Sequence, residues 1–137
     1  MSAWYIDSSA IVKFSVVEPE SAAMAAWRTD LDPEDVVITS ELAVAEVVRA
    51  VRRVGGDVNV ALAHLDSLEQ LVMDRDLMLA AGTVDPPGIR TLDAIHLAAA
   101  LAAGEELGGV VTYDARMADA ARALGLLVLA PGKAPSG

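Results

Sequence analysis

Four acidic side chains lie beside segments that predict regular secondary structure. Asp7 and Asp114 each follow a short apolar run typical of a β-strand. Asp93 lies in the first turn of one predicted helix, and Glu46 lies inside another. Carboxylates that meet within a few ångströms repel one another, and some of them would then hold protons. A divalent cation removes that conflict, so a cluster of these acids would predict a metal site.

The chemistry of such a cluster is constrained by its donor atoms. The chain has no cysteine, and ligation by oxygen alone suits Mg²⁺ or Mn²⁺ better than a closed zinc site. A bound cation of this kind can generate hydroxide from water and neutralise the charge that develops on a phosphodiester. Acidic residues can therefore serve a nucleic-acid substrate, with the metal attracting the phosphate.

The segment from Arg90 to Ala103 should position Asp93. It follows a helix-stopping Asp85-Pro86-Pro87-Gly88, and Thr91 has the residue type of an N-cap. After Asp93 the segment is rich in alanine, leucine and isoleucine, which predicts a helix that is buried on most sides. The carboxylate would thus be held on a rigid element.

The other segments predict alternating strands and helices. Asp7 should begin a helix after the first strand, Pro19 should lie in the first turn of a second helix, and Ser40 should cap a long third helix. We expect strands at 4–6, 36–39, 70–73, 110–113 and 126–129, and helices at 9–16, 18–27, 41–54, 57–69, 74–81, 91–103 and 116–124.

Continuous apolar strands that alternate with helices predict an α/β fold, with a parallel sheet covered on both faces. In such folds, sites form beyond the carboxyl ends of the strands, where the direction of winding reverses. Asp7 and Asp114 should both lie at that edge. Asp93 and Glu46, on helices, can approach it, although the sequence alone does not force them to.

Composition predicts one domain over residues 1–130 and a flexible tail at 131–137. Apolar residues make up 54% of the chain, an excess that suggests a homodimer or another partner. We find no membrane span and no signal peptide in the sequence, and the lack of cysteine is compatible with a reducing compartment. These features predict a soluble, cytoplasmic protein.

The net charge of −10 argues against general electrostatic attraction to nucleic acid. Arg49, Arg52 and Arg53 form a local exception on the predicted helix at 41–54. Arg49 and Arg53 share a helical face with Glu46, because they follow it by three and seven positions. This cluster is either a solvated surface or a contact for RNA.

Taken together, the acids and their neighbours resemble the motifs of a PIN domain, and in particular those of the VapC ribonuclease toxins. The four motifs occur in the family's order over nearly the whole chain: Tyr5-Ile6-Asp7-Ser8-Ser9-Ala10, Ala43-Val44-Ala45-Glu46-Val47-Val48-Arg49-Ala50, Arg90-Thr91-Leu92-Asp93-Ala94-Ile95-His96-Leu97-Ala98 and Val111-Thr112-Tyr113-Asp114. Any one of these motifs is weak, whereas four in order are a strong signal.

The resemblance implies a three-layer α/β/α sandwich with a central parallel sheet. It also implies a Mg²⁺- or Mn²⁺-dependent endoribonuclease that cleaves RNA with metal-activated water and leaves a 5′-phosphate. Asp7, Glu46, Asp93 and Asp114 would be the catalytic and metal-binding residues. A VapC-like protein would also form a homodimer and be silenced by a VapB-like antitoxin of a type II toxin–antitoxin system.

Each of these residues also has a purely structural interpretation. Asp7 and Asp114 could be helix caps, and Asp93 could complement a helix dipole. Glu46 could pair with Arg49 or Arg53. Ser8 and Thr112 could position a ligand oxygen or cap the backbone. His96 follows Asp93 by three positions, a spacing that could ligate a metal, but in an alanine-rich buried helix we expect a packed, hydrogen-bonded histidine, and His64 should lie on the surface.

Two other functions compete with the nuclease. A receiver-like phosphoacceptor domain also has acids and Mg²⁺ at strand ends, with a late lysine for which Lys133 would be the candidate. That design usually needs two acids after the first strand, where this chain has only Asp7. An inactive PIN-like binding module is the other alternative, and the intact acids argue against it.

Overall fold

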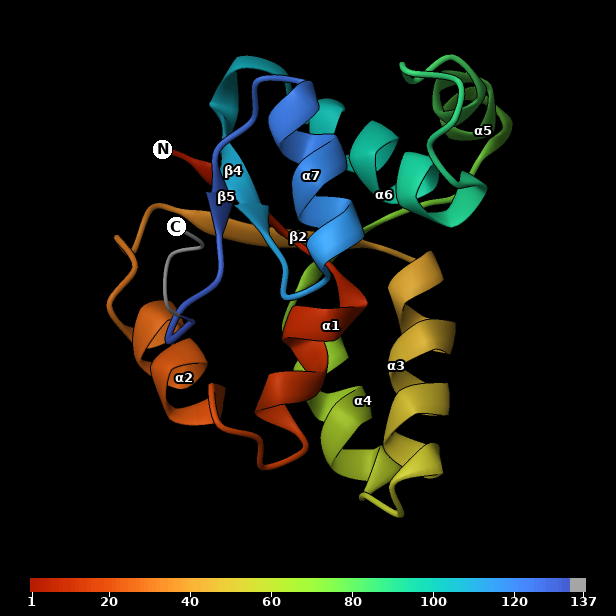
Figure 1. Ribbon diagram of the computed structural model, residues 1–137. Helices are drawn as coiled ribbons and strands as arrows, with labels where there is room; N and C mark the ends of the chain where they lie inside the picture. The colour runs from red at the N-terminus through yellow and green to blue at the C-terminus, as the bar shows by residue number, and fades with distance from the viewer. Residues whose placement is uncertain (134–137) are drawn as a thin grey trace.

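The computed structural model describes residues 1–133 as a central sheet of parallel strands covered by helices on both faces (Figure 1). The strand order is β3-β2-β1-β4-β5, and every neighbouring pair is parallel. The strands are β1 (Ala3–Ile6), β2 (Val36–Ser40), β3 (Glu69–Leu71), β4 (Leu107–Val111) and β5 (Val128–Leu129). The prediction of an α/β fold with a parallel sheet is therefore confirmed.

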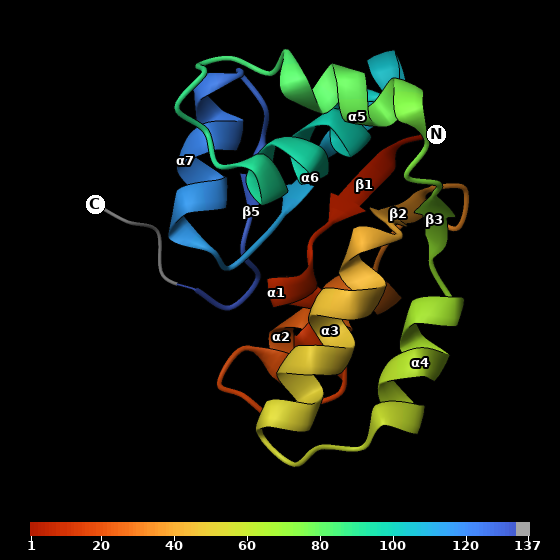
Figure 2. The ribbon, with the colours of Figure 1, turned by 90° about the vertical axis from the view of Figure 1, so that its right-hand side faces the viewer.

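The helices form two layers (Figures 1 and 2). One layer contains α1 (Ser8–Ile11), the 3₁₀ helix η1 (Val12–Phe14), α2 (Ser21–Thr29), α3 (Leu42–Arg53) and α4 (Val58–Asp66). The other contains α5 (Arg75–Gly82), α6 (Thr91–Leu101) and α7 (Ala115–Ala123). A short 3₁₀ helix, η2 (Gly104–Glu106), leads into β4. The result is the predicted α/β/α sandwich.

The two central strands are buried on both faces. Along β1, Tyr5 packs against the layer of α5, α6 and α7, and the next residue, Ile6, packs against the layer of α1 to α4. Val110 and Val111 of β4 alternate in the same way. All four side chains are 0% exposed. This explains why the strands read as continuous apolar runs, since both of their faces are covered.

The winding of the sheet reverses at β1, which lies between β2 and β4. Ile6 is in register with Val111, so the carboxyl ends of β1 and β4 lie side by side. The pairing continues one step further, because the Asp7 N–H donates to the Val111 carbonyl at 3.2 Å. Two segments from opposite ends of the sequence thus meet where α/β proteins form their sites.

Several predicted helix starts were wrong. Ser40 is the last residue of β2 and does not cap α3; its hydroxyl instead hydrogen-bonds to Tyr5. Thr91 is the first residue of α6, whose N-cap position is Arg90. Pro19 precedes α2, because the Ser21 hydroxyl closes a turn by accepting from the Glu18 N–H at 2.9 Å.

Two predicted segments were too long. The helix expected at 57–69 ends at Asp66, because Ser67 caps its last turn by donating to the His64 carbonyl and the chain then enters β3. The final strand, expected from residue 126, comprises only Val128 and Leu129.

Residues 134–137 of the predicted tail lie outside the described residues, so its flexibility stays a prediction. The start of that segment is anchored, since the Tyr113 hydroxyl donates to the Pro131 carbonyl at 2.7 Å. Within residues 1–133, we find no helix with both the length and the apolar character needed to span a bilayer.

Candidate active site

Asp7 is a buried carboxylate in a ring of donors at the end of β1. It is 3% exposed. Its Oδ1 accepts from Ser9 Oγ at 2.6 Å and from the Ala10 N–H at 3.2 Å, and Thr112 Oγ1 donates to its Oδ2. Burial raises the pKa of Asp7 above its usual range, and the hydrogen bonds from Ser9 and Thr112 partly offset that rise. A nearby positive charge would therefore favour the ionised form.

Thr112 connects Asp7 to Asp114. Its hydroxyl donates to Asp7 and accepts from the Asp114 N–H at 3.1 Å. Asp114 caps α7 through Oδ1, which accepts from the N–H groups of Arg116 and Met117. No described residue donates a hydrogen bond to Asp114 Oδ2. The cap thus fixes the carboxylate and leaves one oxygen available.

Asp93 lies in the first turn of α6 and is 9% exposed. Its Oδ2 is buried and has no hydrogen bond from any described residue. The Arg116 Nε lies 3.3 Å from this oxygen, an ion-pair distance without hydrogen-bond geometry. A buried carboxylate oxygen without a hydrogen bond is costly. Asp93 is therefore the acid whose surroundings most clearly suggest a further cationic ligand.

Glu46 lies on α3 and bonds to α6 rather than to its own helix. Its Oε1 is 2.6 Å from His96 Nε2, and His96 Nδ1 is 2.7 Å from the Tyr5 hydroxyl. The Tyr5 hydroxyl also hydrogen-bonds to Ser40 Oγ at 3.2 Å. Burial raises the pKa of the Tyr5 phenol. The prediction that His96 is packed and hydrogen-bonded is confirmed.

The N-terminal parts of α1, α3, α6 and α7 surround one region beyond the carboxyl ends of β1 and β4 (Figure 1). Thr112 links Asp7 to Asp114, and Arg116 links Asp114 to Asp93. His96, which lies on α6 with Asp93, hydrogen-bonds to Glu46. The structure therefore brings the acidic residues to one edge of the sheet. Within residues 1–133, however, no three His, Asp or Glu side chains are close enough to share one ion.

The structural interpretations hold for three of the acids. Asp93 lies in the first turn of α6, where a carboxylate complements the helix dipole. Asp7 and Asp114 are indeed the N-caps of α1 and α7. Glu46, in contrast, forms no ion pair with an arginine among the described residues; its partner is His96. Capping does not exclude a ligand role, because Asp114 uses only one of its two oxygens for it.

Some predictions about neighbouring residues need correction. In the described part of the chain Ser8 makes no side-chain hydrogen bond, and Ser9 contacts Asp7 instead. Thr112 caps the backbone by accepting from the Asp114 N–H, and its hydroxyl also donates to the Asp7 carboxylate. His64 is half-buried and stacks on Phe14, with 5.4 Å between ring centroids.

Sequence reasoning also missed Arg116, Ser9 and Tyr5. Arg116 follows Asp114 by two positions, and this short spacing could have indicated that the arginine lies near the acids. The role of Tyr5 could have been suspected only from its place before Asp7 in an inward-facing strand position. Its contact with His96 joins residues far apart in the sequence, which no local pattern predicts.

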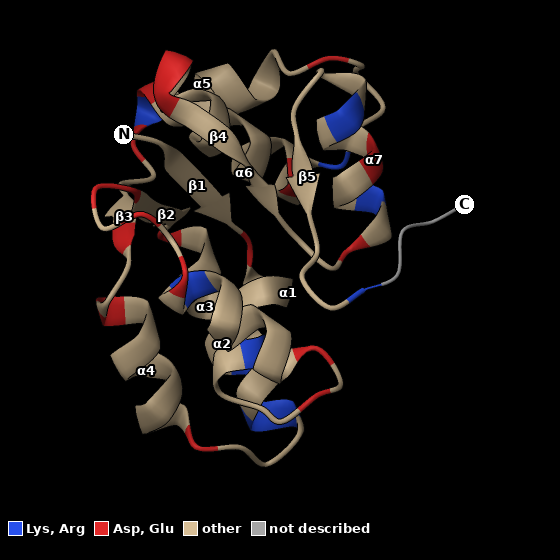
Figure 3. Ribbon diagram, turned by 90° about the vertical axis from the view of Figure 1, so that its left-hand side faces the viewer, with Lys and Arg blue, Asp and Glu red and all other residues tan. Residues whose placement is uncertain are grey.

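The arginines on α3 are all exposed, at positions 49, 52 and 53. Together they line a shallow depression near the C-terminal end of the helix. Within residues 1–133, none of the three has a carboxylate partner within ion-pair distance. Acidic residues are distributed over loops and over both helical layers of this protein (Figure 3), so three arginines close together on one helix are a distinct local feature.

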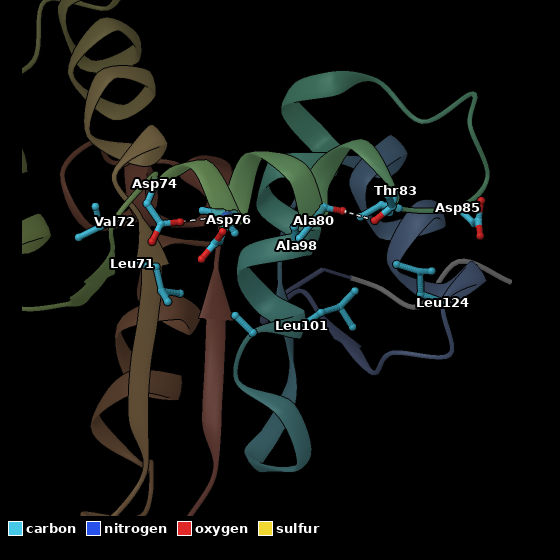
Figure 4. Close-up of a pocket in the computed structure, with 13 residues that line it drawn as sticks. Leu71, Val72, Asp74, Asp76, Ala80, Thr83, Asp85, Ala98, Leu101 and Leu124 are labelled. Atoms are coloured by element: carbon cyan, nitrogen blue, oxygen red, sulfur yellow. Dashed lines mark hydrogen bonds between the residues drawn. The ribbon is translucent and has the colours of Figure 1, made fainter.

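A cavity of about 660 Å³ lies away from the acids. Figure 4 shows it along α5 and α6, with Leu71 and Val72 at one end and Asp85 and Leu124 at the other. Asp74, at its edge, is occupied as the N-cap of α5. The lining is mainly apolar and includes none of the four acids. This groove is therefore not the candidate catalytic site.

Comparison with protein families matches the PIN domain to residues 4–123. The chain is 47% identical over 135 residues to Ribonuclease VapC46 of Mycobacterium tuberculosis (strain ATCC 25618 / H37Rv), covering 96% of this chain and 99% of the relative. It is 43% identical over 139 residues to Ribonuclease VapC35 of the same strain, covering 95% and 98%.

Solved structures show the same fold. VapC20 of Mycobacterium tuberculosis, described as a sarcin-ricin loop cleaving toxin, superposes with a TM-score of 0.71 at 17% identity, covering 93% of this chain and 99% of that one. VapBC2 from Rickettsia felis, solved with a DNA fragment from its promoter, superposes with a TM-score of 0.66 at 14% identity, covering 93% and 97%.

Proposed function

The chain belongs to the PIN-domain family and, within it, to the VapC ribonucleases; from this membership and the site's geometry we propose that it is a toxin–antitoxin endoribonuclease that depends on Mg²⁺ or Mn²⁺. The observation that carries the proposal is the buried Asp93 Oδ2, which has no hydrogen bond although it lies at the same edge as the other acids. Family membership sets aside the receiver-like alternative.

The donor atoms fit a hard divalent cation. Asp93 has a buried oxygen without a hydrogen bond, and among the described residues nothing donates to Asp114 Oδ2 or Glu46 Oε2. Within residues 1–133, no three His, Asp or Glu side chains are close enough to share one ion, so part of the coordination would come from water, several molecules of which Mg²⁺ usually keeps. We propose that Asp7, Glu46, Asp93 and Asp114 hold the ion directly or through water.

A bound divalent cation supplies activation of water and neutralisation of phosphate charge. The chain's own residues supply the rest. Ser9 and Thr112 hold the Asp7 carboxylate, and the cap of α7 holds Asp114. No side-chain nucleophile is required, because water is the proposed attacking group.

RNA is the proposed substrate. On a protein of net charge −10, the arginines at positions 49, 52 and 53 would provide phosphate contacts near Glu46 without carboxylates competing for them. Arg49 and Arg53 lie on the same helix as Glu46, so contacts at these positions would place the RNA backbone along α3 toward the acids. Ser8 remains a proposed positioning residue at the start of α1.

We further propose a VapB-like antitoxin as partner, a homodimer as the assembly and the cytoplasm as the location. Co-expression with the product of an adjacent small reading frame should yield a stable complex. Molar-mass measurement of the protein alone should give twice the chain mass of 14.2 kDa. The apolar groove along α5 and α6, with Leu101 42% exposed, is compatible with self-association.

The test is RNA cleavage by the wild type and by Asp93→Asn. The wild type should cleave RNA with Mg²⁺ or Mn²⁺, stop on chelation and arrest growth on expression. Asp93→Asn should lose at least about 100-fold in rate and relieve the arrest, because an amide is a weaker metal ligand. Asp119→Asn, at an exposed carboxylate on α7, is the matched control. Equal cleavage by both variants would exclude the proposed site, and a wild type without cleavage would favour the binding-module alternative.

A further inference from the structure

Tyr5 and His96 have no role in the chemistry described above, but they form a hydrogen-bonded chain that ends at Glu46. This chain of hydrogen bonds leads from Tyr5 in β1 through His96 in α6 to Glu46 in α3, and so joins the two helical layers at the edge of the sheet. Tyr5 is 0% exposed and His96 is 3% exposed. The Glu46 side chain, at the outer end, is 27% exposed. The chain therefore leads from the core to a carboxylate that can reach solvent.

The direction of the last hydrogen bond follows from chemistry. An ionised carboxylate only accepts hydrogen bonds, so His96 Nε2 must carry the proton that it shares with Glu46 Oε1 at 2.6 Å. The other ring nitrogen, Nδ1, is held at 2.7 Å by the Tyr5 hydroxyl. With both nitrogens engaged and the ring buried, His96 cannot rotate without breaking two hydrogen bonds.

We propose that His96, held by Tyr5, is a positioning residue that orients the Glu46 carboxylate toward the divalent cation; this inference rests on the proposed function. One oxygen of Glu46 is fixed by the imidazole, and among described residues the other, Oε2, has no donor. Glu46 lies on a helix with freely rotating bonds between backbone and carboxylate, so without this anchor it would sample several rotamers. Fixing it lowers the entropy cost of binding a metal.

An alternative is that His96 only fills space in the core. In that case an apolar residue of similar size would preserve the metal affinity, because the buried volume would be kept. If His96 acts through Glu46, the decisive feature is the N–H at the Nε2 position. The side chain of glutamine can place an amide N–H near that position, whereas leucine cannot.

The experiment measures Mn²⁺ binding to the protein without RNA, by titration calorimetry, for the wild type, His96→Leu, His96→Gln and Tyr5→Phe. His96→Leu should weaken Mn²⁺ binding by about 10- to 100-fold, the range for residues that orient a metal ligand. His96→Gln should regain most of the Mn²⁺ affinity that His96→Leu loses. Tyr5→Phe should cause a smaller, several-fold loss, because Glu46 keeps its donor. His64→Leu, at the other histidine, should bind Mn²⁺ like the wild type.

Thermal unfolding of each variant in chelator separates folding from positioning. A folded His96→Leu with wild-type Mn²⁺ affinity would overturn the inference while leaving the proposed function intact. Weaker Mn²⁺ binding in both His96→Leu and His96→Gln, with unchanged binding in Tyr5→Phe, would also overturn the inference. The N–H at the Nε2 position would then not be the decisive group. A wild type that binds no Mn²⁺ would refute the metal-dependent function and this inference together.

If His96→Leu fails to fold, Tyr5→Phe decides. It removes only one oxygen atom, so an unchanged Mn²⁺ affinity in that variant would overturn the role assigned to the buried chain.

Discussion

Arg116 Nε lies 3.3 Å from Asp93 Oδ2 and connects the first turn of α7 to the first turn of α6. The arginine side chain is 52% exposed, whereas the Asp93 side chain is 12% exposed. A half-exposed cation thus faces a largely buried carboxylate. At a site proposed to bind a divalent ion, such an arginine competes for the same oxygen.

We therefore predict that Arg116→Gln increases the affinity of the protein for Mn²⁺ in the absence of RNA. An ion pair this exposed contributes about 0.2–1 kcal/mol, which corresponds to a gain of up to about fivefold. Titration calorimetry measures the change, with Arg122→Gln on the same helix as control, because Arg122 pairs with the exposed Asp119. Weaker Mn²⁺ binding in Arg116→Gln would mean that the arginine supports the ion rather than competing with it.

Asp7 predicts an unusual pH dependence of stability in the metal-free protein. Burial raises its pKa in the folded state above the ordinary value of 3.8, so the folded state holds this proton more tightly than the unfolded chain. The stability from the protonated group is present below about pH 3.8 and is lost as the pH rises through the folded-state pKa.

Asp7→Asn should therefore melt at a higher temperature than the wild type at pH 7 in chelator, and the difference should shrink as the pH falls toward 4. Mg²⁺ should raise the melting temperature of the wild type more than that of the variant, because a cation favours the ionised carboxylate. Asp119→Asn, at a residue whose side chain is 82% exposed, is the control. A wild type that is more stable than Asp7→Asn at pH 7 in chelator would contradict the assigned cost of burial.

Thr112→Val tests the connection between Asp7 and Asp114. The change removes the hydroxyl that donates to the Asp7 carboxylate and accepts from the Asp114 N–H. Leaving such buried groups unsatisfied should lower the free energy of unfolding by about 1–3 kcal/mol. Urea denaturation measures this change in the free energy of unfolding. Thr112→Ser keeps the hydroxyl, so its free energy of unfolding should fall much less. An equal fall in both variants would assign the effect to the methyl group instead.

The arginines of α3 predict a salt-dependent change in RNA binding. In chelator, where cleavage is prevented, the double variant Arg49→Gln/Arg53→Gln should bind a single-stranded RNA more weakly. Its slope of log affinity against log salt concentration should be shallower by about 0.7 for each lost phosphate contact. Fluorescence anisotropy at several salt concentrations measures this. Arg122→Gln again serves as control, and an unchanged slope in the double variant would show that this surface is only solvated.

The sequence determined the fold class and indicated the candidate acids, because these depend on local patterns. Apolar runs such as Val36–Ser40 and the acids that follow strands are visible within a few residues of one another. Order along the chain then sufficed to indicate the family. Some helix starts were wrong because Ser40 and Thr91 have the residue types of caps, but Ser40 bonds to Tyr5 and Thr91 lies one position inside α6.

Only the tertiary structure decided which side chains meet at the edge of the sheet. Tyr5 and His96, or Thr112 and Asp7, are about a hundred positions apart and contact each other because β1 pairs with β4 and α6 packs over both. Likewise, Asp93 has a buried oxygen facing Arg116, while Asp7 is satisfied by Ser9 and Thr112. The residue type Asp is the same in both cases, and the difference arises from burial and donors that the folded chain alone supplies.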